Sequence, residues 1–183
     1  MFGFDIDGVL YPWHELAYEW AIEALHEDIS FDDFWRKGGF VSQNEGSIFL
    51  NNMVRNPLLY NKRSIPPYIV DAAWKISDIF EGKICYITSR PAGIEADTMS
   101  WVHRNKLPRP EMIFFSKNMP KDTIVKEIGV THFVEDHHKY ITQLEPIVQL
   151  YVIDMIYNEH MKLSTAIRVN DISDIPALIK KGY

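Results

Sequence analysis

Two aspartates, Asp5 and Asp7, end a short apolar segment at the start of the chain and are followed by Gly8. A spacing of two puts both side chains on one face of a strand, but the strand is expected to end after Ile6. Gly8 relaxes the backbone there, so the second carboxylate can turn away from the first. Burying two carboxylates is costly unless a cation or hydrogen bonds compensate. The pattern therefore indicates a magnesium site with one carboxylate as nucleophile and the other as acid/base, although a turn after an edge strand is the simpler alternative.

Three further polar groups follow apolar segments later in the chain. They are Thr88-Ser89, Lys121 and the acidic pair Glu135-Asp136. In an open parallel sheet, ligands bind outside the carboxyl ends of the strands, so these groups are expected to meet the two N-terminal aspartates. Each signal alone is common, because Thr-Ser and acidic pairs often cap helices. Their order along the chain indicates one site.

The elements that must position these groups alternate from residue 82 onward. Apolar strands are predicted over 83–87, 112–115, 132–134, 147–153 and 166–169, and helices over 94–105, 121–128, 137–144 and 173–180. Such alternation predicts an α/β, Rossmann-like fold in which a parallel sheet has helices on both faces.

Residues 13–81 interrupt this alternation with helical periodicity alone. Helices are predicted over 13–26, from the capping box of Ser30 and Asp33 to about 38, over 45–55, and from Pro66-Pro67 to Gly82. The stretch is too apolar for a disordered linker. We therefore expect two parts, a catalytic core of residues 1–12 and 82–183 and a helical cap of residues 13–81 inserted after the first strand.

Composition narrows the class of protein. The chain has 183 residues, of which 46% are hydrophobic and 24% are charged, and its net charge is −6. These values are typical of a globular domain, and an acidic chain without a basic stripe argues against a nucleic acid polymer as partner. The one cysteine, Cys85, excludes an internal disulfide and is expected to be buried. No targeting or membrane-spanning segment is visible, so the sequence predicts a cytoplasmic protein with no membrane partner.

The string from Phe4 to Leu10, Phe-Asp-Ile-Asp-Gly-Val-Leu, resembles the first motif of the haloacid dehalogenase superfamily of phosphotransferases. The later groups follow in the order of that superfamily: a strand ending in Thr or Ser, a Lys, and an apolar strand ending in an acidic pair. The resemblance implies a Rossmann-like core with a small all-helical cap after the first strand.

The resemblance also implies a role for each motif residue. Asp5 would be the nucleophile that forms an aspartyl-phosphate, and Asp7 would protonate the leaving alkoxide and then activate water. Mg²⁺ would be held by Asp5, Asp136 and a backbone carbonyl at Asp7. Thr88 would donate a hydrogen bond to a phosphoryl oxygen, and Lys121 would supply a fixed positive charge.

Three assignments in this set have competitors. Lys117 and Lys126 compete with Lys121, which we favour because it opens the helix before the acidic strand, as the lysine of the superfamily does. Glu135 departs from the double Asp of many relatives, which leaves its contact with the metal open. The pair His137-His138 allows a transition-metal site, but a solvated helix start is the favoured interpretation.

Within the superfamily, the chain resembles the 5′(3′)-deoxyribonucleotidases and their bacterial and phage relatives. Trp13 and the pair Phe34-Trp35 look like the aromatics of that family's cap, and core packing is the alternative for them. Ser89 and Arg90 follow Thr88 and are further candidates for binding substrate. For Arg90 the alternative is a surface arginine before Pro91.

These observations predict a Mg²⁺-dependent phosphomonoesterase that hydrolyses nucleoside monophosphates. The first alternative is a phosphatase of the same superfamily for another small phosphomonoester, such as a sugar phosphate. The second is a non-catalytic binding module that keeps the fold. The sequence fits a homodimer as well as a monomer, and it names neither the base nor the sugar of the substrate.

Overall fold

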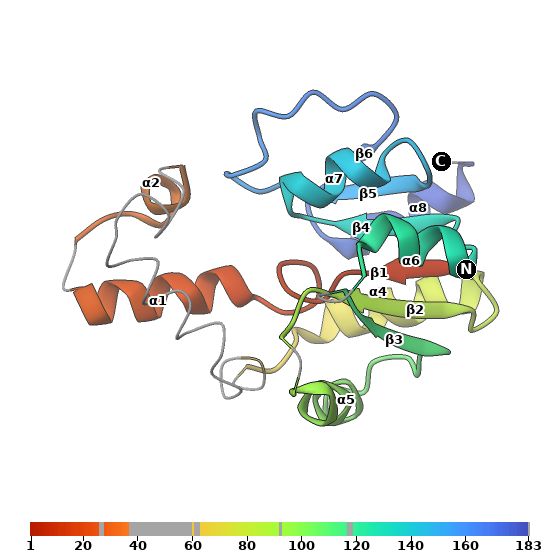
Figure 1. Cartoon of the computed structure of the whole chain (residues 1–183), viewed down its shortest axis with the longest axis horizontal. Coiled ribbons are helices and arrows are strands. Elements are labelled where there is room, and N and C mark those ends of the chain that lie inside the picture. Colours follow the sequence, from red (N-terminus) through yellow and green to blue (C-terminus); the bar gives the residue numbers. More distant parts are fainter. Residues whose placement is uncertain (26–27, 37–59, 61–62, 92, 117–118, 183) are drawn as a thin grey trace.

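The computed structural model describes residues 1–25, 28–36, 60, 63–91, 93–116 and 119–182 (Figure 1). Its centre is a six-stranded sheet with the order β3-β2-β1-β4-β5-β6, in which every neighbouring pair is parallel. The strands are β1 (Phe2–Phe4), β2 (Ile84–Thr88), β3 (Met112–Phe115), β4 (His132–Glu135), β5 (Gln149–Ile153) and β6 (Ile167–Val169). The predicted α/β class is confirmed.

Helices cover both faces of this sheet, because its central strands are apolar on both sides. The helices of this part are α4 (Pro67–Ile79), α5 (Glu95–Arg104), α6 (Lys121–Ile128), α7 (His138–Leu144) and α8 (Ile175–Lys180), the last preceded by a 3₁₀ turn, Ile172–Asp174. Helices α6 and α7 pack with Cys85 and Phe133 on one face, and α4 and α8 pack with Phe2 and Phe4 on the other (Figure 1). Cys85 is a free, buried thiol, as expected.

Local sequence signals set several element ends. Pro67 lies in the first turn of α4, where its missing N–H costs nothing. Gly129 ends α6 with a left-handed φ of 71°, a conformation that glycine adopts without strain. Ser30 caps α2 (Phe31–Arg36): its Oγ accepts a hydrogen bond from the backbone N–H of Asp33 at 3.2 Å and donates to the Asp33 carboxylate at 2.9 Å.

Helices α1 (Trp13–Leu25) and α2 lie to one side of the sheet, beyond the carboxyl ends of its strands (Figure 1). Helix α4 belongs to the residues predicted as cap, yet its buried Ile69, Ala72 and Ile76 pack in the core cluster of Phe2 and Phe4. The division at residues 12–13 and 81–82 stays a prediction. The predicted helix over 45–55 and the predicted helix end near residue 38 lie outside the described residues. No described helix is long and apolar enough to cross a membrane.

Candidate active site

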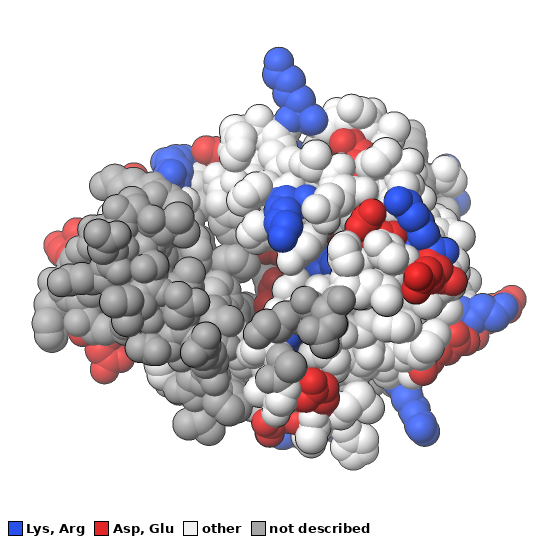
Figure 2. All heavy atoms as spheres, viewed as in Figure 1, with Lys and Arg blue, Asp and Glu red and all other residues white. Residues whose placement is uncertain are grey.

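The ends of three adjacent strands carry the predicted polar groups. Asp5 follows β1, Thr88 ends β2, and Glu135 ends β4, with Asp136 directly after it. Because β1 lies between β2 and β4 and all three run parallel, these groups meet at one edge of the sheet. Asp5, Glu135 and Asp136 border a pocket of about 170 Å³ that Lys121 also lines. A hollow with acidic atoms at its bottom is visible near the middle of the face in Figure 2.

Lys121 stands between two carboxylates at the centre of this site. Its ammonium donates to Asp5 Oδ1 at 2.6 Å and to Glu135 Oε2 at 2.7 Å, and all three side chains are buried. Burial alone lowers the pKa of Lys121, but the charges of Asp5 and Glu135 outweigh it and raise that pKa above its ordinary value. A cation is therefore fixed beside Asp5, and a catalytic role for Lys121 stays a prediction. Of its competitors, Lys126 pairs with Asp122 at the surface, and Lys117 lies outside the described residues.

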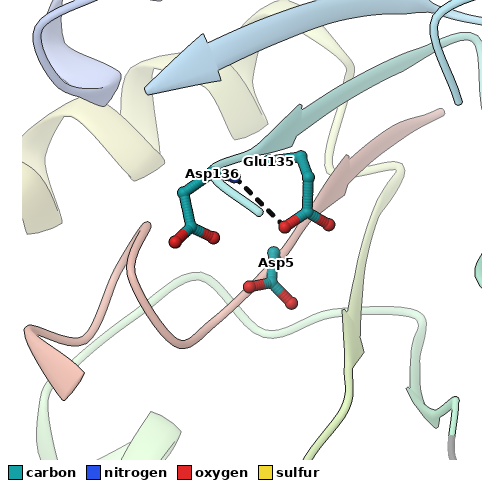
Figure 3. Close-up of side chains that lie close together, drawn as sticks. All are labelled: Asp5, Glu135 and Asp136. Carbon is teal, nitrogen blue, oxygen red and sulfur yellow. Dashed lines mark hydrogen bonds between the residues drawn. The ribbon is translucent and has the colours of Figure 1, made fainter. Parts of the chain in front are cut away.

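Three carboxylates lie close together here, and Lys121 pairs with two of them. Ligand atoms of Asp5, Glu135 and Asp136 lie within 4.8 Å of one another, and their carboxyl groups converge on one space (Figure 3). Burial, the largest cause, raises the pKa of Asp5 to about 8 and those of Glu135 and Asp136 to about 7, and repulsion among the carboxylates adds to this. The cluster therefore carries an uncompensated negative charge when all three groups are ionised.

This cluster fits a divalent cation with a preference for oxygen ligands. Asp136 Oδ1 is buried and has no hydrogen-bond partner among the described residues, which is costly unless a ligand satisfies it. Asp5 and Asp136 supply hard anionic oxygens from two strand ends, the type of ligand that Mg²⁺ prefers. Neither His137 nor His138 belongs to a group of metal-ligand type among the described residues, so the carboxylates are the better candidate.

Glu135 serves chiefly to hold its neighbours. Its Oε2 accepts from Lys121, and its Oε1 accepts from the backbone N–H groups of Asp136 and His137, each at 3.1 Å. Figure 3 shows the bond from Asp136. Both oxygens are thus occupied by protein donors. Glu135 orients the lysine and the start of the following loop, which explains why an acidic residue stands here without requiring that it bind metal.

Gly8 allows the chain to turn sharply after Asp7. Its φ is 94°, and a Cβ atom at this position would lie 2.2 Å from Asp136 Oδ2. The turn is closed by hydrogen bonds between Gly8 N–H and the Tyr11 carbonyl at 2.8 Å and between Tyr11 N–H and the Ile6 carbonyl at 2.8 Å. A side chain at residue 8 would therefore displace the Asp136 carboxylate.

Arg90 is buried against Asp7, so the surface alternative for this arginine is wrong. Its Nη1 donates to Thr98 Oγ1 at 3.2 Å, and its guanidinium lies about 5 Å from the ring centroids of Tyr60 and Trp101. Its Nε and Nη2 both donate to the Asp7 carboxylate. Arg90 lines the pocket, but its donors face Asp7 and Thr98, and contact with substrate stays a prediction.

Thr88 and Ser89 face different partners. The Thr88 hydroxyl donates to Asp7 Oδ2 at 3.3 Å and accepts from the Arg90 backbone N–H at 3.2 Å. Ser89 lines the pocket, and its hydroxyl donates to the Tyr140 hydroxyl at 2.8 Å. Ser89 thus has the more open position, and phosphoryl binding by Thr88 stays a prediction.

The three predicted cap aromatics have different surroundings. Trp13 lines the pocket together with Asp5, Glu135 and Asp136. Phe34 is buried against Tyr18, so it packs between α1 and α2. Trp35 packs against His14 with ring centroids 4.9 Å apart and against Tyr157 at 5.9 Å. Trp13 and Trp35 are therefore the better candidates for contact with substrate.

Four aromatic residues near the site were not predicted from the sequence. His14, Tyr60 and Tyr140 line the pocket, and Tyr157 donates a hydrogen bond to Asp136. Burial lowers the pKa of His14 to about 3, so its imidazole is neutral at physiological pH. Tyr157 lies beyond β5 with residues 154–156 between them, and Tyr60 lies far from any predicted strand end, so neither carried a local signal in the sequence.

Comparisons with known proteins agree with this fold. No family model matches the chain. A protein of Bacillus cereus with the provisional name nucleotidase is 25% identical to it over 191 residues, which cover 98% of each chain. A haloacid dehalogenase-like hydrolase of Streptococcus pneumoniae superposes with a TM-score of 0.65 at 10% identity, covering 97% of both chains. CbbY of Rhodobacter sphaeroides, solved in complex with phosphate, superposes with a TM-score of 0.58 at 15% identity, covering 95% of both. At these identities, the feature shared with the solved structures is the fold.

Proposed function

We propose that this chain, which has the fold of the haloacid dehalogenase-like hydrolases, is a Mg²⁺-dependent phosphomonoesterase acting through an aspartyl-phosphate on Asp5. The preferred substrates under this proposal are nucleoside monophosphates. The name of the Bacillus cereus relative supports the nucleotide preference.

One observation carries the proposal: Asp5 Oδ1 lies 2.6 Å from the ammonium of Lys121, and Asp5 shares a carboxylate cluster with Asp136, whose buried Oδ1 has no hydrogen-bond partner among the described residues. A nucleophile that attacks a phosphoryl group must be close to positive charge, because the phosphoryl oxygens are anionic. Lys121 supplies one such charge. A non-catalytic module has no need of a buried cluster that costs stability, so the cluster argues for catalysis.

The proposed reaction has two steps. In the first, an oxygen of Asp5 attacks phosphorus, the ester P–O bond breaks, and Asp7 gives its proton to the departing alkoxide. In the second, Asp7 takes a proton from water as the water oxygen attacks phosphorus. The bond between phosphorus and Asp5 then breaks, which releases inorganic phosphate and restores both aspartates. Lys121 faces the phosphoryl oxygens in both steps.

Mg²⁺ fits the same cluster and would be held by Asp5 and Asp136, together with the backbone carbonyl of Asp7 as the resemblance implies. When bound, it neutralises negative charge on the phosphoryl oxygens. Lys121 alone balances only one of the three buried carboxylates, so the cation also stabilises the ionised form of Asp5.

The small volume of the pocket supports a second candidate function. The pocket bordered by described residues is about 170 Å³, small for a whole nucleotide, since ligand pockets commonly enclose about 300 Å³ or more. Under the nucleotidase proposal, phosphate and sugar occupy this pocket and the base extends toward Trp13 and Trp35. A smaller phosphomonoester, such as a sugar phosphate, would fit without that extension.

A phosphate-release screen over nucleoside monophosphates and common sugar phosphates, with Mg²⁺ or with chelator, tests the proposal. We expect release from nucleoside monophosphates, only in the presence of Mg²⁺. Release from sugar phosphates alone would favour the second candidate. No release from any phosphomonoester by a protein that binds Mg²⁺ would indicate a binding module.

A further inference from the structure

Asp136 is held by hydrogen bonds from the segment that follows β5. The phenol of Tyr157 donates to Asp136 Oδ2, and the side-chain amide of Asn158 donates to the Asp136 carbonyl at 2.6 Å. Two consecutive residues therefore bind the side chain and the main chain of one carboxylate residue. Neither contact takes part in the chemistry of the proposed reaction.

These two residues are themselves fixed in place. Asn158 is fully buried, and its amide also donates to the Ile153 carbonyl at the end of β5 at 2.9 Å. Arg168 donates to Asn158 Oδ1 at 2.8 Å and to the Asn158 carbonyl at 2.7 Å. The segment is thus tied to the sheet at both β5 and β6, which leaves the Tyr157 hydroxyl little freedom to move.

His14, in the first turn of α1, supports Tyr157 from the other side. The two rings lie 4.7 Å apart, and His14 Nδ1 is 3.3 Å from the Tyr157 oxygen. The only phenolic proton is donated to Asp136, so this contact requires that Nδ1 carry the imidazole proton. The order of donation is then His14 to Tyr157 to Asp136.

The two oxygens of Asp136 consequently have opposite surroundings. Oδ2 is enclosed by Tyr157, by His14 at 3.7 Å and by the backbone of Gly8. Oδ1 has no hydrogen-bond partner among the described residues, although it is buried. A carboxylate with one oxygen fixed and the other free is oriented for a ligand on the free side.

We propose that Tyr157, supported by His14, is a positioning residue that orients Asp136 so that Oδ1 is presented to Mg²⁺. The inference rests on the proposed function, because it assumes that the carboxylate cluster binds this ion. Groups that orient a metal ligand in this way typically contribute 10- to 100-fold to metal affinity.

Calorimetric titration of chelator-treated protein with Mg²⁺ tests this proposal without measuring activity. Tyr157→Phe keeps the ring and removes the hydroxyl, and we expect Mg²⁺ to bind about 10- to 100-fold more weakly. Tyr86→Phe is the matched control, since the Tyr86 hydroxyl is also buried and donates to the Pro108 carbonyl at 2.8 Å, away from the cluster. It should leave the affinity for Mg²⁺ unchanged.

Titration with Ca²⁺ separates orientation from general loosening. Mg²⁺ demands near-ideal octahedral ligands, whereas Ca²⁺ accepts flexible geometry. Tyr157→Phe should therefore weaken Mg²⁺ binding more than Ca²⁺ binding. His14→Phe removes Nδ1 from the same chain of hydrogen bonds and should weaken Mg²⁺ binding by a smaller factor, with little added loss in the double variant. If Tyr157→Phe does not fold, His14→Phe carries the test.

The outcomes distinguish this inference from the proposed function. Unchanged or tighter Mg²⁺ binding in Tyr157→Phe, or an equal loss for Mg²⁺ and Ca²⁺, overturns the positioning role while the Mg²⁺ site of the wild-type protein stands. A wild-type protein that binds no Mg²⁺ overturns both. Selective weakening of Mg²⁺ binding in Tyr157→Phe, with Tyr86→Phe unchanged, supports the positioning role.

Discussion

Arg90 donates two hydrogen bonds to the carboxylate of Asp7, which lines the same pocket as the carboxylate cluster. Arg90 Nε lies 2.9 Å from Asp7 Oδ2, and Nη2 lies 2.8 Å from Oδ1. The arginine side chain is fully buried, whereas the aspartate side chain is 19% exposed. A planar guanidinium that meets both carboxylate oxygens fixes the plane of the carboxylate as well as its position. Arg90 therefore determines where the proposed acid/base of the reaction points.

Replacing Arg90 should impair the protonation of the leaving group by Asp7. Arg90→Lys cannot reproduce the two-point contact, so Asp7 loses its fixed orientation. We expect turnover of an alkyl phosphate, whose leaving group needs a proton, to fall at least 10-fold more than turnover of p-nitrophenyl phosphate, whose leaving group does not. Steady-state kinetics on the two substrates give the ratio.

Thr98→Val is the matched control for Arg90→Lys. It removes the partner of Nη1 but leaves both bonds to Asp7, and it should cost about 1–3 kcal/mol of stability, because a buried donor loses its acceptor. Its ratio of rates on the two substrates should equal that of the wild-type protein. An equal loss on both substrates in Arg90→Lys would mean that the arginine serves the fold alone.

The stability of the metal-free protein should fall as pH rises from about 6.5 to about 8. The folded pKa values of Asp5, Glu135 and Asp136, about 8, 7 and 7, exceed those of the unfolded chain, so the folded state holds protons that the unfolded state has released. This contribution is complete below the unfolded pKa values and is lost as pH rises through the folded ones. The pKa values of His14 and His137 are lowered to about 3 and 4 in the folded state, so the contribution of these residues to stability rises with pH. That rise is complete by about pH 6.5, the pKa of histidine in the unfolded chain.

Denaturant unfolding at several pH values, with chelator and with saturating Mg²⁺, checks this dependence. Mg²⁺ neutralises the cluster and should remove most of the fall between pH 6.5 and 8, so the stabilisation by Mg²⁺ should grow with pH. A metal-free protein of constant or rising stability over this interval would contradict the charge balance proposed for the cluster.

The features of the fold and the site that could be predicted are those determined by residues close together in the sequence. Residues 112–115 and 121–128 form β3 and α6 as predicted, because an apolar run and a helix ended by glycine are local patterns. The approach of Asp5, Lys121 and Asp136 was also predictable, since parallel strands bring their carboxyl ends to one edge. The haloacid dehalogenase resemblance was correct for the fold.

Burial of charged side chains was harder to predict. Arg90 follows a strand end and precedes Pro91, which fits a surface turn, but Tyr11, Tyr60 and Trp101 enclose it from three distant segments. Tyr157 was similarly missed as a partner of Asp136, because the contact depends on the path of the chain between β5 and β6. Such contacts arise from tertiary packing, on which local periodicity carries no information.

The indoles of the predicted cap should contribute to recognition of a base. Stacking of a base on an aromatic side chain is worth about 1–3 kcal/mol by alanine substitution. Trp13→Ala and Trp35→Ala should therefore lower kcat/KM for a nucleoside monophosphate roughly 5- to 150-fold and leave an alkyl phosphate almost unaffected. Trp74→Ala, at a half-exposed position on α4, is the control and should change neither rate. Equal losses on both substrates would assign the two indoles to packing.

Capture of the phosphorylated enzyme tests the role of Asp5 most directly. Asp7→Asn keeps the nucleophile but can neither protonate an alkoxide nor activate water, so with p-nitrophenyl phosphate, whose leaving group needs no proton, a phosphoryl group should accumulate on Asp5. After acid quench, mass spectrometry of the N-terminal peptide should reveal the added mass of one phosphoryl group at Asp5. The double variant that combines Asp5→Asn with Asp7→Asn should show no added mass. Phosphate release by a folded Asp5→Asn variant at a near-normal rate, or a phosphoryl group on another residue, would contradict the proposed mechanism.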